Sequence, residues 1–367
     1  MRDLDTLRRE LNGLDRELVA LFERRMNISV EVGAYKAAHD MPILQPERER
    51  EVLASRVALL EEPKWAPATR RFFQLLMDVG KDAQLDVVAD VRAHPVVAYQ
   101  GVAAGYGEQA ASGHFPEAQL TPCATFDQVV EAVEQGKADY GVLPLENSLT
   151  GPVIQPLDLR GATGLYLVGE RSLPIDHCLM MLPGGRIEDV CQVFSHEQAL
   201  AQCAPYLQAH PRWRAVPQLN TALAAQLVAR SGDTTLAAIA SRRAAEVYGL
   251  EIVAESIQSG PVNRTRFGIL GRNMNDAGSK TTVFFILRNV SGSLQQALSA
   301  LCAHGINLIA LHPRPMAGQP FSYTFLADFT GGVDQLHVQQ ALAEMQRNCE
   351  FFRVVGSYHP DAMEGAS

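Results

Sequence analysis

The spacing of apolar residues at the start of the chain predicts one long helix. Leucines recur at every third or fourth position over residues 4–21, and the same spacing continues as far as Tyr35. No proline interrupts this pattern before Pro42, so we expect the helix to cover residues 4–39. At about 1.5 Å per residue such a helix is on the order of 54 Å long, which exceeds a small globular core. A partner helix is therefore expected along it.

Two cations lie on the face of this helix that should be apolar. Arg25 stands where the spacing calls for leucine, and Lys36 lies on the same face about 16 Å further along. Arg8 is about 25 Å from Arg25 and about 100° around the helix, so it reaches the same place only from an antiparallel second copy. Two interpretations stay open: a coiled-coil seam that tolerates one arginine, or a pocket for a dianionic ligand in a helical bundle.

Two further helices are predicted before residue 90. Pro46 suits the first position of a second helix that ends near Leu60, with Gln45 as its N-cap. A third helix is expected over residues 67–84, and charged residues and turn signals indicate a linker at 86–95. The long first helix has too little partner surface within one chain, so we expect a dimer.

Short apolar runs alternate with helical patterns over the middle of the chain. This alternation predicts an α/β domain with mostly parallel sheets, in which ligands bind at the carboxyl ends of strands. Polar residues stand near three expected strand ends: Glu146 with Asn147, Ser195 with His196, and Thr265 with Arg266. Each pair also has a purely structural interpretation, as a capped turn, a helix cap or a surface hairpin.

The last part of the chain reads as strand, helix, strand, strand, helix, strand, which predicts a ferredoxin-like unit. The length of 367 residues allows two or three domains. We therefore expect a multidomain protein that is all-α over residues 1–90, α/β over 95–272 and α+β over 279–360.

The charge and cysteine content narrow the class of protein. A net charge of −9 disfavours nucleic acid or an anionic membrane as a partner. The six cysteines show no metal-ligand spacing and suggest reduced thiols, and no metal site is expected. No run approaches the roughly 18 apolar residues of a membrane span, and the start of the chain is charged from its second residue. A cytoplasmic protein is expected.

The first part of the chain resembles the helical chorismate mutase family in the segments LRRELNGLDRELVALFERR, EVGAYK, PERER and FFQLL. The resemblance implies a dimer of three-helix chains in which each long helix contributes to two pockets. It also implies the following site residues, of which Arg8 reaches the pocket of the partner: Arg8, Arg25, Lys36, Arg48, Glu49 and Gln84. Gln45 and Gly80 occupy positions where the family often has an acid and a serine, so a weakened mutase is expected.

The residue types suit a rearrangement that needs no nucleophile. Arginine forks hold two carboxylates so that the reacting ends meet. Lys36 and Gln84 can donate to the ether oxygen as its C–O bond breaks, and Glu49 is either protonated or accepts a hydrogen bond from a substrate hydroxyl.

The middle of the chain resembles the prephenate dehydratases and the related arogenate dehydratases in VLPLENS, IDHCL, SHEQALAQC, NTALAAQ, AAIASRRAAEVYGL and NRTRF. The resemblance implies two α/β lobes around a hinge cleft, with Thr265 as the favoured catalytic group and Glu146 as a second candidate acid. It further implies substrate contacts from Asn147, Ser195, Gln202, Arg266 and Phe267. The family usually carries hydroxyl residues where this chain has Gly105 and Gly107, which predicts weaker substrate affinity.

The last part of the chain resembles an ACT regulatory domain, which in this family binds phenylalanine at a subunit interface. The implied phenylalanine-binding residues are Gly292, Ser293, Leu294, Asn307, Leu308, His312 and Arg314. His312 and Pro313 replace an acid and a serine of the family pattern, so a domain that only dimerises stays an alternative.

Together these resemblances imply a bifunctional enzyme that converts chorismate through prephenate to phenylpyruvate, forms a homodimer or a higher homo-oligomer, and is inhibited by phenylalanine. Neither reaction requires a cofactor. Two alternatives stay open: a dehydratase that prefers arogenate beside a weakened mutase, and a non-catalytic sensor of amino acids. The sensor is disfavoured because it has no reason to keep Arg8, Arg25, Lys36 and Thr265 at these positions.

Overall fold

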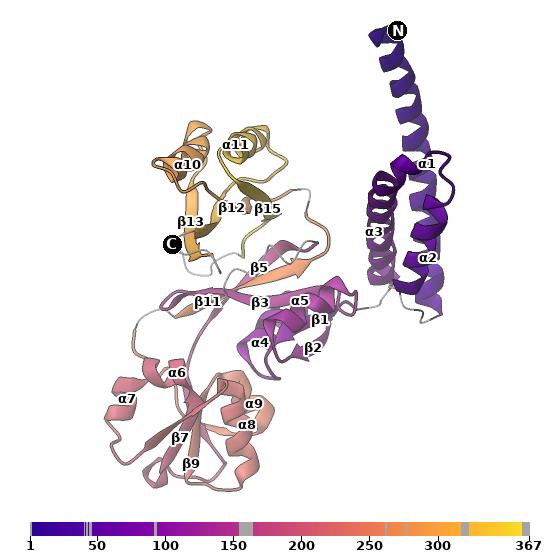
Figure 1. Cartoon of the computed structure of the whole chain (residues 1–367). Coiled ribbons are helices and arrows are strands. Elements are labelled where there is room, and N and C mark those ends of the chain that lie inside the picture. Colours follow the sequence, from indigo (N-terminus) through magenta and orange to yellow (C-terminus); the bar gives the residue numbers. More distant parts are fainter. Residues whose placement is uncertain are drawn as a thin grey trace. The chain divides into compact units, whose positions relative to one another are not determined.

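In the computed structural model the chain folds into two compact units, residues 1–95 and residues 96–367 (Figure 1). The structure describes residues 2–39, 41, 43, 46–91, 94–153, 164–260, 263–275, 277–316 and 323–361. Within these ranges no helix has the length and apolar character needed to cross a bilayer.

In its described residues the first unit has three α-helices and one short 3-10 turn. They are α1 (Leu4–Ala38), α2 (Pro46–Val57), η1 (Pro63–Trp65) and α3 (Ala66–Val91). The long first helix is confirmed, and the Asp3 carboxylate caps it by accepting hydrogen bonds from the backbone N–H groups of Asp5 and Thr6. The third helix is longer than predicted and runs through most of the expected linker. No proline stands between Pro67 and Pro95 to end it.

The apolar face of α1 is largely uncovered within one chain. The side chains of Leu11, Leu14, Leu18 and Leu21 are each more than half exposed. The buried contact lies at the other end of α1, where a Cβ atom at Gly33 would come within 2.8 Å of the Gln84 Cα. Glycine therefore permits the close approach of α1 and α3 at this point.

The second unit begins with a large lobe built on five strands in the order β5-β11-β3-β1-β2. The strands are β1 (Val96–Gln100), β2 (Gln119–Cys123), β3 (Tyr140–Asn147), β5 (Tyr166–Pro174) and β11 (Arg264–Gly271), and β4 (Gly151–Pro152) pairs with β3. Helices α4 (Tyr106–His114) and α5 (Phe126–Glu134) pack against this sheet.

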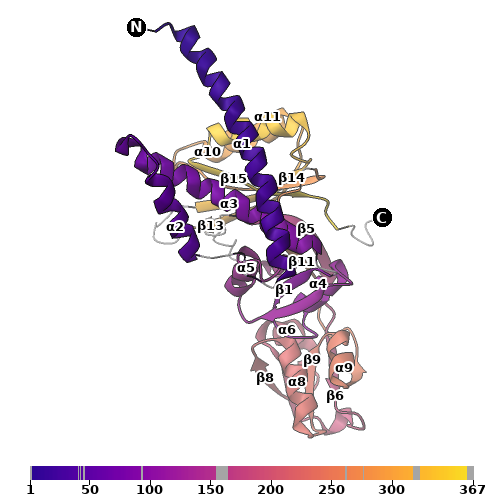
Figure 2. The ribbon, with the colours of Figure 1, turned by 90° about the vertical axis from the view of Figure 1, so that its right-hand side faces the viewer.

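A second lobe carries a separate sheet in the order β10-β6-β9-β7-β8 (Figure 2). Its strands are β6 (Cys178–Met181), β7 (Gln192–His196), β8 (Arg214–Gln218), β9 (Leu236–Ala240) and β10 (Glu251–Ala254). Its helices are α6 (Glu197–Gln202), α7 (Ala204–Gln208), α8 (Thr221–Ser231) and α9 (Arg242–Tyr248), with a 3-10 turn η2 (Ile187–Asp189). The chain passes between the lobes twice, after β5 and after β10, as expected for a hinged pair of lobes.

The expectation of mostly parallel sheets was wrong. β1 runs parallel to β2 and β3, and β7 runs parallel to β8 and β9. However, β11 is antiparallel to β3 and β5, and β6 is antiparallel to β9 and β10. β6 and β11 are the first strands after the chain passes from one lobe to the other, and each runs antiparallel to its neighbours. The alternation of apolar runs along the sequence does not show the direction of a strand.

The C-terminal region has the predicted order of elements: β12 (Lys280–Ile286), α10 (Ser293–Ala303), β13 (Leu308–Pro315), β14 (Tyr323–Thr330), α11 (Leu336–Arg347) and β15 (Phe351–Tyr358). The strands are antiparallel in the order β13-β14-β12-β15, which is a ferredoxin-like arrangement. Both helices pack on one face of these strands. β15 also pairs with β5 at Gly356 and Leu167, where a Cβ atom on Gly356 would overlap the Leu167 carbonyl oxygen. This pairing joins the C-terminal strands and the large lobe in one ten-stranded sheet.

Candidate functional sites

A cavity of about 130 Å³ lies among the three helices of the first unit. It is lined by Arg25, Ser29, Lys36, Ile43, Arg48, Glu49, Val52, Met77, Gly80, Lys81 and Gln84. Six of the residues that the sequence implied for a mutase site are therefore brought together by α1, α2 and α3. Gln45 lies outside the described residues.

Two cations of this cavity, Arg25 and Lys36, donate to backbone carbonyl groups. Arg25 Nη1 donates to the Leu76 carbonyl oxygen at 2.6 Å, and Lys36 Nζ donates to that of Ile43 at 3.1 Å. Burial lowers the pKa of Arg25 and also that of Lys36, where the charge of Glu49 acts in the opposite direction. A serine side chain at Gly80 would press on Arg25, because a Cβ atom there would lie 3.2 Å from Arg25 Nη1.

Two residues differ from the prediction for this cavity: Lys81 lines it and Arg8 does not. Lys81 was not singled out from the sequence, although it precedes Gln84 by three positions and therefore shares its helix face. Lys81 Nζ lies 3.0 Å from Glu49 Oε2 and 2.9 Å from Asp78 Oδ1. Arg8 does not line the cavity of its own chain; it is exposed and lies 3.6 Å from Asp5 Oδ1.

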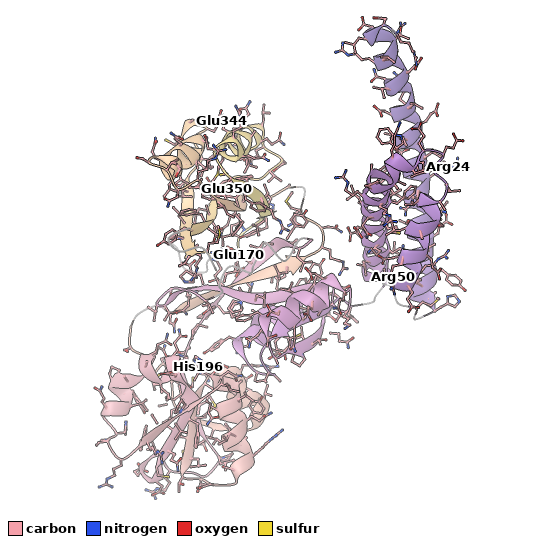
Figure 3. All side chains as sticks on the ribbon, viewed as in Figure 1. Arg24, Arg50, Glu170, His196, Glu344 and Glu350 are labelled. Carbon is pink, nitrogen blue, oxygen red and sulfur yellow. The ribbon has the colours of Figure 1, made fainter. Side chains whose placement is uncertain are left out.

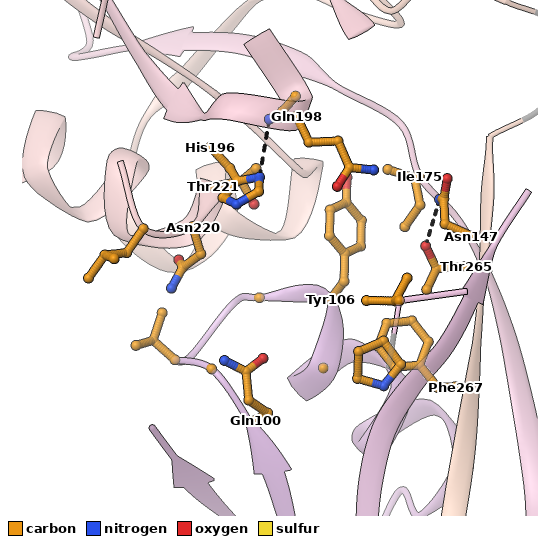
Figure 4. Close-up of a pocket in the computed structure, with 18 of the residues that line it drawn as sticks. Gln100, Tyr106, Asn147, Ile175, His196, Gln198, Asn220, Thr221, Thr265 and Phe267 are labelled. Atoms are coloured by element: carbon orange, nitrogen blue, oxygen red, sulfur yellow. Dashed lines mark hydrogen bonds between the residues drawn. The ribbon is translucent and has the colours of Figure 1, made fainter. Parts of the chain in front are cut away.

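A larger cavity of about 360 Å³ lies between the two lobes of the second unit (Figure 4). It is lined by Gln100, Gly101, Val102, Gly105, Tyr106, Gly107, Phe126, Pro144, Asn147, Val153, Ile175, His177, His196, Gln198, Ala199, Gln202, Leu219, Asn220, Thr221, Thr265 and Phe267. Four of the predicted residues are present: Asn147, Gln202, Thr265 and Phe267. None of the described lining residues is an arginine or a lysine, so hydrogen bonds from neutral groups dominate the surface of this cleft.

Asn147 and Thr265 are directly opposed on neighbouring strands β3 and β11. The Asn147 side chain is oriented by the backbone, because its Oδ1 accepts hydrogen bonds from the N–H groups of Leu149 and Thr150. Its Nδ2 then donates to Thr265 Oγ1 at 3.0 Å (Figure 4). Thr265 is buried, and the hydrogen of its hydroxyl remains free to donate to a ligand in the cleft.

The Asn147 side chain also belongs to a network of hydrogen-bonded side chains that extends to His177. Asn147 Nδ2 also donates to Asn263 Oδ1, and Asn263 Nδ2 donates to Gln202 Oε1. Gln202 Oε1 therefore also accepts from His177 Nε2, at 2.8 Å. Burial lowers the pKa of His177, so the ring is neutral with its proton on Nε2. Gln202 Nε2 and His177 Nδ1 are buried without hydrogen-bond partners.

His196 lines the cleft and caps α6, which was one of the two interpretations of Ser195 with His196, because its Nδ1 accepts from the Gln198 backbone N–H at 3.3 Å (Figure 4). Sequence reasoning missed two other lining residues, Tyr106 and His177. Tyr106 donates from its hydroxyl to the Asp176 carbonyl oxygen at 2.9 Å. His177 belongs to the quoted IDHCL segment, which is the one local signal that could have identified it.

Two glycines after β1 leave little space for a side chain: Gly105, which precedes α4, and Gly107 in its first turn. A Cβ atom on Gly107 would lie 2.5 Å from the Gln100 carbonyl oxygen, and one on Gly105 would lie 3.0 Å from that of Val102. The loop is held from the other lobe, since the Tyr248 hydroxyl donates to the Ala103 carbonyl oxygen at 2.9 Å. A hydroxyl residue at Gly107 therefore requires the backbone to shift, whereas one at Gly105 requires a smaller adjustment.

Three residues that we expected to contact substrate do not line the cleft. The Ser195 hydroxyl is fully buried and donates to the Ile239 carbonyl oxygen at 2.6 Å. Glu146 and Arg266 point away from the cleft, because they are adjacent to Asn147 and Thr265 and neighbouring residues of a strand face opposite sides. Arg266 Nη2 donates to Glu146 Oε2 at 3.2 Å.

Glu146 and Arg266 belong to an ion cluster with Glu170, Lys280 and Asp328. Arg266 Nη1 lies 3.1 Å from Glu170 Oε2 and 2.8 Å from Asp328 Oδ2, and Lys280 Nζ lies 2.8 Å and 3.2 Å from the same oxygens. Glu170 comes from the large lobe (Figure 3), whereas Lys280 and Asp328 come from β12 and β14. The cluster therefore connects the back of the strand that carries Thr265 to the C-terminal region.

The residues implied for phenylalanine binding are spread over the C-terminal strands and α10. Gly292 precedes α10 with a φ of 83°, and Ser293 and Leu294 begin that helix. Strand register places this loop at the end of the sheet where Arg314 lies, because Ile286 and Arg314 both pair with Thr324. Asn307 and Leu308 lie at the opposite end. His312 and Arg314 contact the large lobe, at 3.8 Å from Glu146 Oε2 and 3.4 Å from the Pro152 carbonyl oxygen.

Comparison with known proteins assigns a family to each of the two parts of the chain that contain these cavities. Residues 97–275 match the family model described as prephenate dehydratase, and residues 7–85 match that of chorismate mutase type II. A bifunctional chorismate mutase/prephenate dehydratase of Aquifex aeolicus is 33% identical over 362 residues, which is 98% of each chain. An arogenate dehydratase/prephenate dehydratase of Arabidopsis thaliana is 40% identical over 286 residues, 72% of this chain and 69% of the relative.

Two solved structures have a similar second unit. One, described as GqqA, a quorum quenching acylase, has a TM-score of 0.67 at 32% identity and covers 73% of this chain and 98% of its own. The other is a prephenate dehydratase of Arthrobacter aurescens in complex with L-Phe, with a TM-score of 0.65 at 29% identity, covering 72% of this chain and 89% of its own. With the full-length match to the Aquifex aeolicus relative, the chain belongs to the bifunctional chorismate mutase/prephenate dehydratase family.

Proposed function

We propose that this protein rearranges chorismate to prephenate in its helical unit and converts prephenate to phenylpyruvate in the cleft of its second unit, as an enzyme of phenylalanine biosynthesis. The observation that carries the proposal is the occurrence of both constellations on one chain. Arg25, Lys36 and Arg48 meet in one cavity, and Asn147 orients Thr265 in another.

The mutase site acts by positioning and electrostatics. Arginine forks bind the two carboxylates of chorismate and hold its reacting ends together. Lys36 and Gln84 donate hydrogen bonds to the ether oxygen, on which negative charge grows in the transition state. No residue forms a covalent bond to the substrate.

A homodimer completes the mutase site in this proposal. The exposed leucines of α1 form an apolar face that a second copy can cover. An antiparallel copy of α1 brings Arg8 to the cavity that contains Arg25, which accounts for the place of Arg8 outside the cavity of its own chain.

The dehydratase step uses Thr265 as the proton donor to the departing hydroxyl. The bond between the ring and its carboxylate breaks, and CO2 leaves. The bonding electrons enter the ring and expel the 4-hydroxyl, which takes a proton from Thr265 and leaves as water. Asn147 stabilises the oxygen of Thr265 during this transfer by donating to it. A threonine hydroxyl is a weak acid, so it acts as a relay and regains its proton from solvent.

Loss of CO2 is favoured by the neutral surface of the cleft. A carboxylate that is paired with arginine or lysine is stabilised and decarboxylates slowly, and the described lining residues include neither. Apolar side chains such as Phe267, Phe126 and Ile175 keep water from the ring. Glu146 takes no part in proton transfer, because Arg266 binds its carboxylate on the other face of the sheet.

We further propose that residues 279–360 form an ACT domain through which phenylalanine inhibits the dehydratase. The ferredoxin-like strand order supports this, as does the L-Phe complex of the Arthrobacter aurescens relative. Gly292 and Asn307 lie at opposite ends of the sheet in one chain, so a site that uses both must combine two subunits. The enzyme is proposed to be cytoplasmic, in keeping with its six free cysteines.

One set of assays tests these proposals. Purified protein is given chorismate, prephenate or arogenate in turn, with and without phenylalanine, and the loss of substrate is followed. We expect loss of chorismate, a higher kcat/KM for prephenate than for arogenate, and inhibition of the dehydratase by phenylalanine. Unchanged chorismate would end the mutase proposal, a preference for arogenate would reassign the substrate, and no effect of phenylalanine would end the regulatory proposal.

A further inference from the structure

Lys81 lines the mutase cavity and pairs with two acidic side chains, one of which, Glu49, lines the same cavity. Its Nζ donates to both carboxylate oxygens of Glu49, at 3.0 Å and 3.2 Å, and lies 2.9 Å from Asp78 Oδ1. The Lys81 and Glu49 side chains are only 20% and 24% exposed. This pair is therefore partly shielded from solvent and lies on the wall of the cavity.

The charge state of Glu49 decides what it can do for a substrate. A protonated carboxyl group donates a hydrogen bond, whereas a carboxylate only accepts. A cation that contacts both oxygens favours the carboxylate. Burial lowers the pKa of Lys81, but its hydrogen bonds to Asp78 and Glu49 outweigh this and raise it, so Lys81 stays charged.

We propose that Lys81 is a positioning residue of the mutase, which holds Glu49 as a carboxylate that accepts the hydrogen of the chorismate hydroxyl. The inference rests on the proposed mutase function and adds a residue to it. Lys81 itself does not contact the substrate, because its ammonium group is occupied by Glu49 and Asp78.

Lys81 also balances the charge of the cavity. Chorismate carries two negative charges, and an unpaired carboxylate at Glu49 repels it. With Lys81 in place, the charge of Glu49 is partly offset, which reduces this repulsion. The same pairing fixes the rotamer of Glu49, so its oxygen is already directed before binding.

The test compares Lys81→Met with Lys81→Arg, which keeps the charge, and with Asp78→Asn, which keeps the Lys81–Glu49 pair. For Lys81→Met we expect KM for chorismate to rise about tenfold. The reason is that Glu49 is left as an unpaired negative charge on the cavity wall and repels the dianionic substrate. Lys81→Arg and Asp78→Asn should keep the wild-type KM, because both retain a cation beside Glu49.

A second variant separates this role from a structural one. In Lys81→Met/Glu49→Gln both charges are absent, so KM for chorismate should be lower than in Lys81→Met. Circular dichroism and dehydratase activity verify that each variant is folded. A Lys81→Met enzyme with the KM of the wild type would overturn the proposal. Absence of chorismate turnover in the wild type would instead overturn the mutase function itself.

Discussion

Asn147 donates a 3.0 Å hydrogen bond from Nδ2 to Oγ1 of Thr265, across the neighbouring strands β3 and β11. The direction of this bond is fixed, because Asn147 Oδ1 accepts from the backbone N–H groups of Leu149 and Thr150. Thr265 therefore cannot donate to Asn147, and its hydrogen is left for the ligand. One amide thus determines in which direction the proposed proton donor acts.

Asn147→Asp reverses that direction. A carboxylate at position 147 accepts from the Thr265 hydroxyl and turns its hydrogen away from the cleft, so we expect dehydratase kcat to fall by about 10²-fold. Steady-state kinetics with prephenate measure this, and mutase activity on chorismate is the internal control. A variant within twofold of the wild-type kcat would show that the orientation of Thr265 does not matter.

Gly107→Ser introduces a hydroxyl into the first turn of α4 but should not improve the dehydratase. A Cβ atom at this position lies 2.5 Å from the Gln100 carbonyl oxygen, so the loop must shift, at a cost of about 1–3 kcal/mol. We expect a lower Tm and a lower kcat/KM. The matched control is Gly113→Ser in the same helix, where the nearest atom to a Cβ is 3.5 Å away. Tighter substrate binding by Gly107→Ser with unchanged Tm would contradict the steric interpretation.

Asp328→Asn removes a carboxylate from the ion cluster behind Thr265. Burial alone would raise the pKa of Asp328, but the charges of Arg266 and Lys280 outweigh it and lower the pKa. Its pKa in the folded state is thus below the ordinary value of 3.8, so its contribution to stability is present above about pH 3.8 and is lost as pH falls further.

We therefore expect Asp328→Asn to lower the free energy of unfolding by about 3 kcal/mol at pH 7, as for one partner lost from a buried ion pair. The difference between wild type and variant should shrink below about pH 3.8. Urea denaturation at pH 7 and pH 3 measures both values. An equal difference at the two pH values would rule out ionised Asp328 as the cause.

Arg8→Ala should inactivate the mutase without dissociating the dimer, and Arg25→Ala should do the same from the other side of the shared cavity. Mixed and refolded together, the two variants should recover about a quarter of wild-type activity, since half the dimers are mixed and each holds one intact site. Light scattering confirms the dimer in each sample. Mixed dimers without any activity would argue that no cavity is shared between chains.

The spacing of residues along α1 predicts which side chains face the mutase cavity. The alternation of residues along a strand likewise predicts which side chains of β11 face the cleft. Arg25 and Lys36 share a face because of their spacing on α1, and the structure places both at the cavity. The same kind of reasoning shows that Thr265 and Arg266 cannot both face the cleft, because adjacent strand residues point to opposite sides. Lys81 could have been found in the same way from its spacing to Gln84.

Other features depend on contacts that no local pattern encodes. The hydrogen bonds of Gln202 to His177 and Asn263 connect segments that are far apart in the chain. The pairing of β15 with β5 depends on the absence of a side chain at Gly356. A single glycine in the sequence does not predict such a pairing. The reversed direction of β6 and β11 follows from the path of the chain between lobes, which apolar runs do not record.

The most direct test of two separate sites on one chain is the fate of chorismate given to Thr265→Ala. The wild type should convert chorismate to phenylpyruvate, whereas the variant should consume chorismate at the wild-type rate and accumulate prephenate in equal amount. Phenylpyruvate from the variant at the wild-type rate would remove Thr265 from the dehydratase mechanism. Loss of chorismate consumption in the variant would contradict independent sites, which is the central claim.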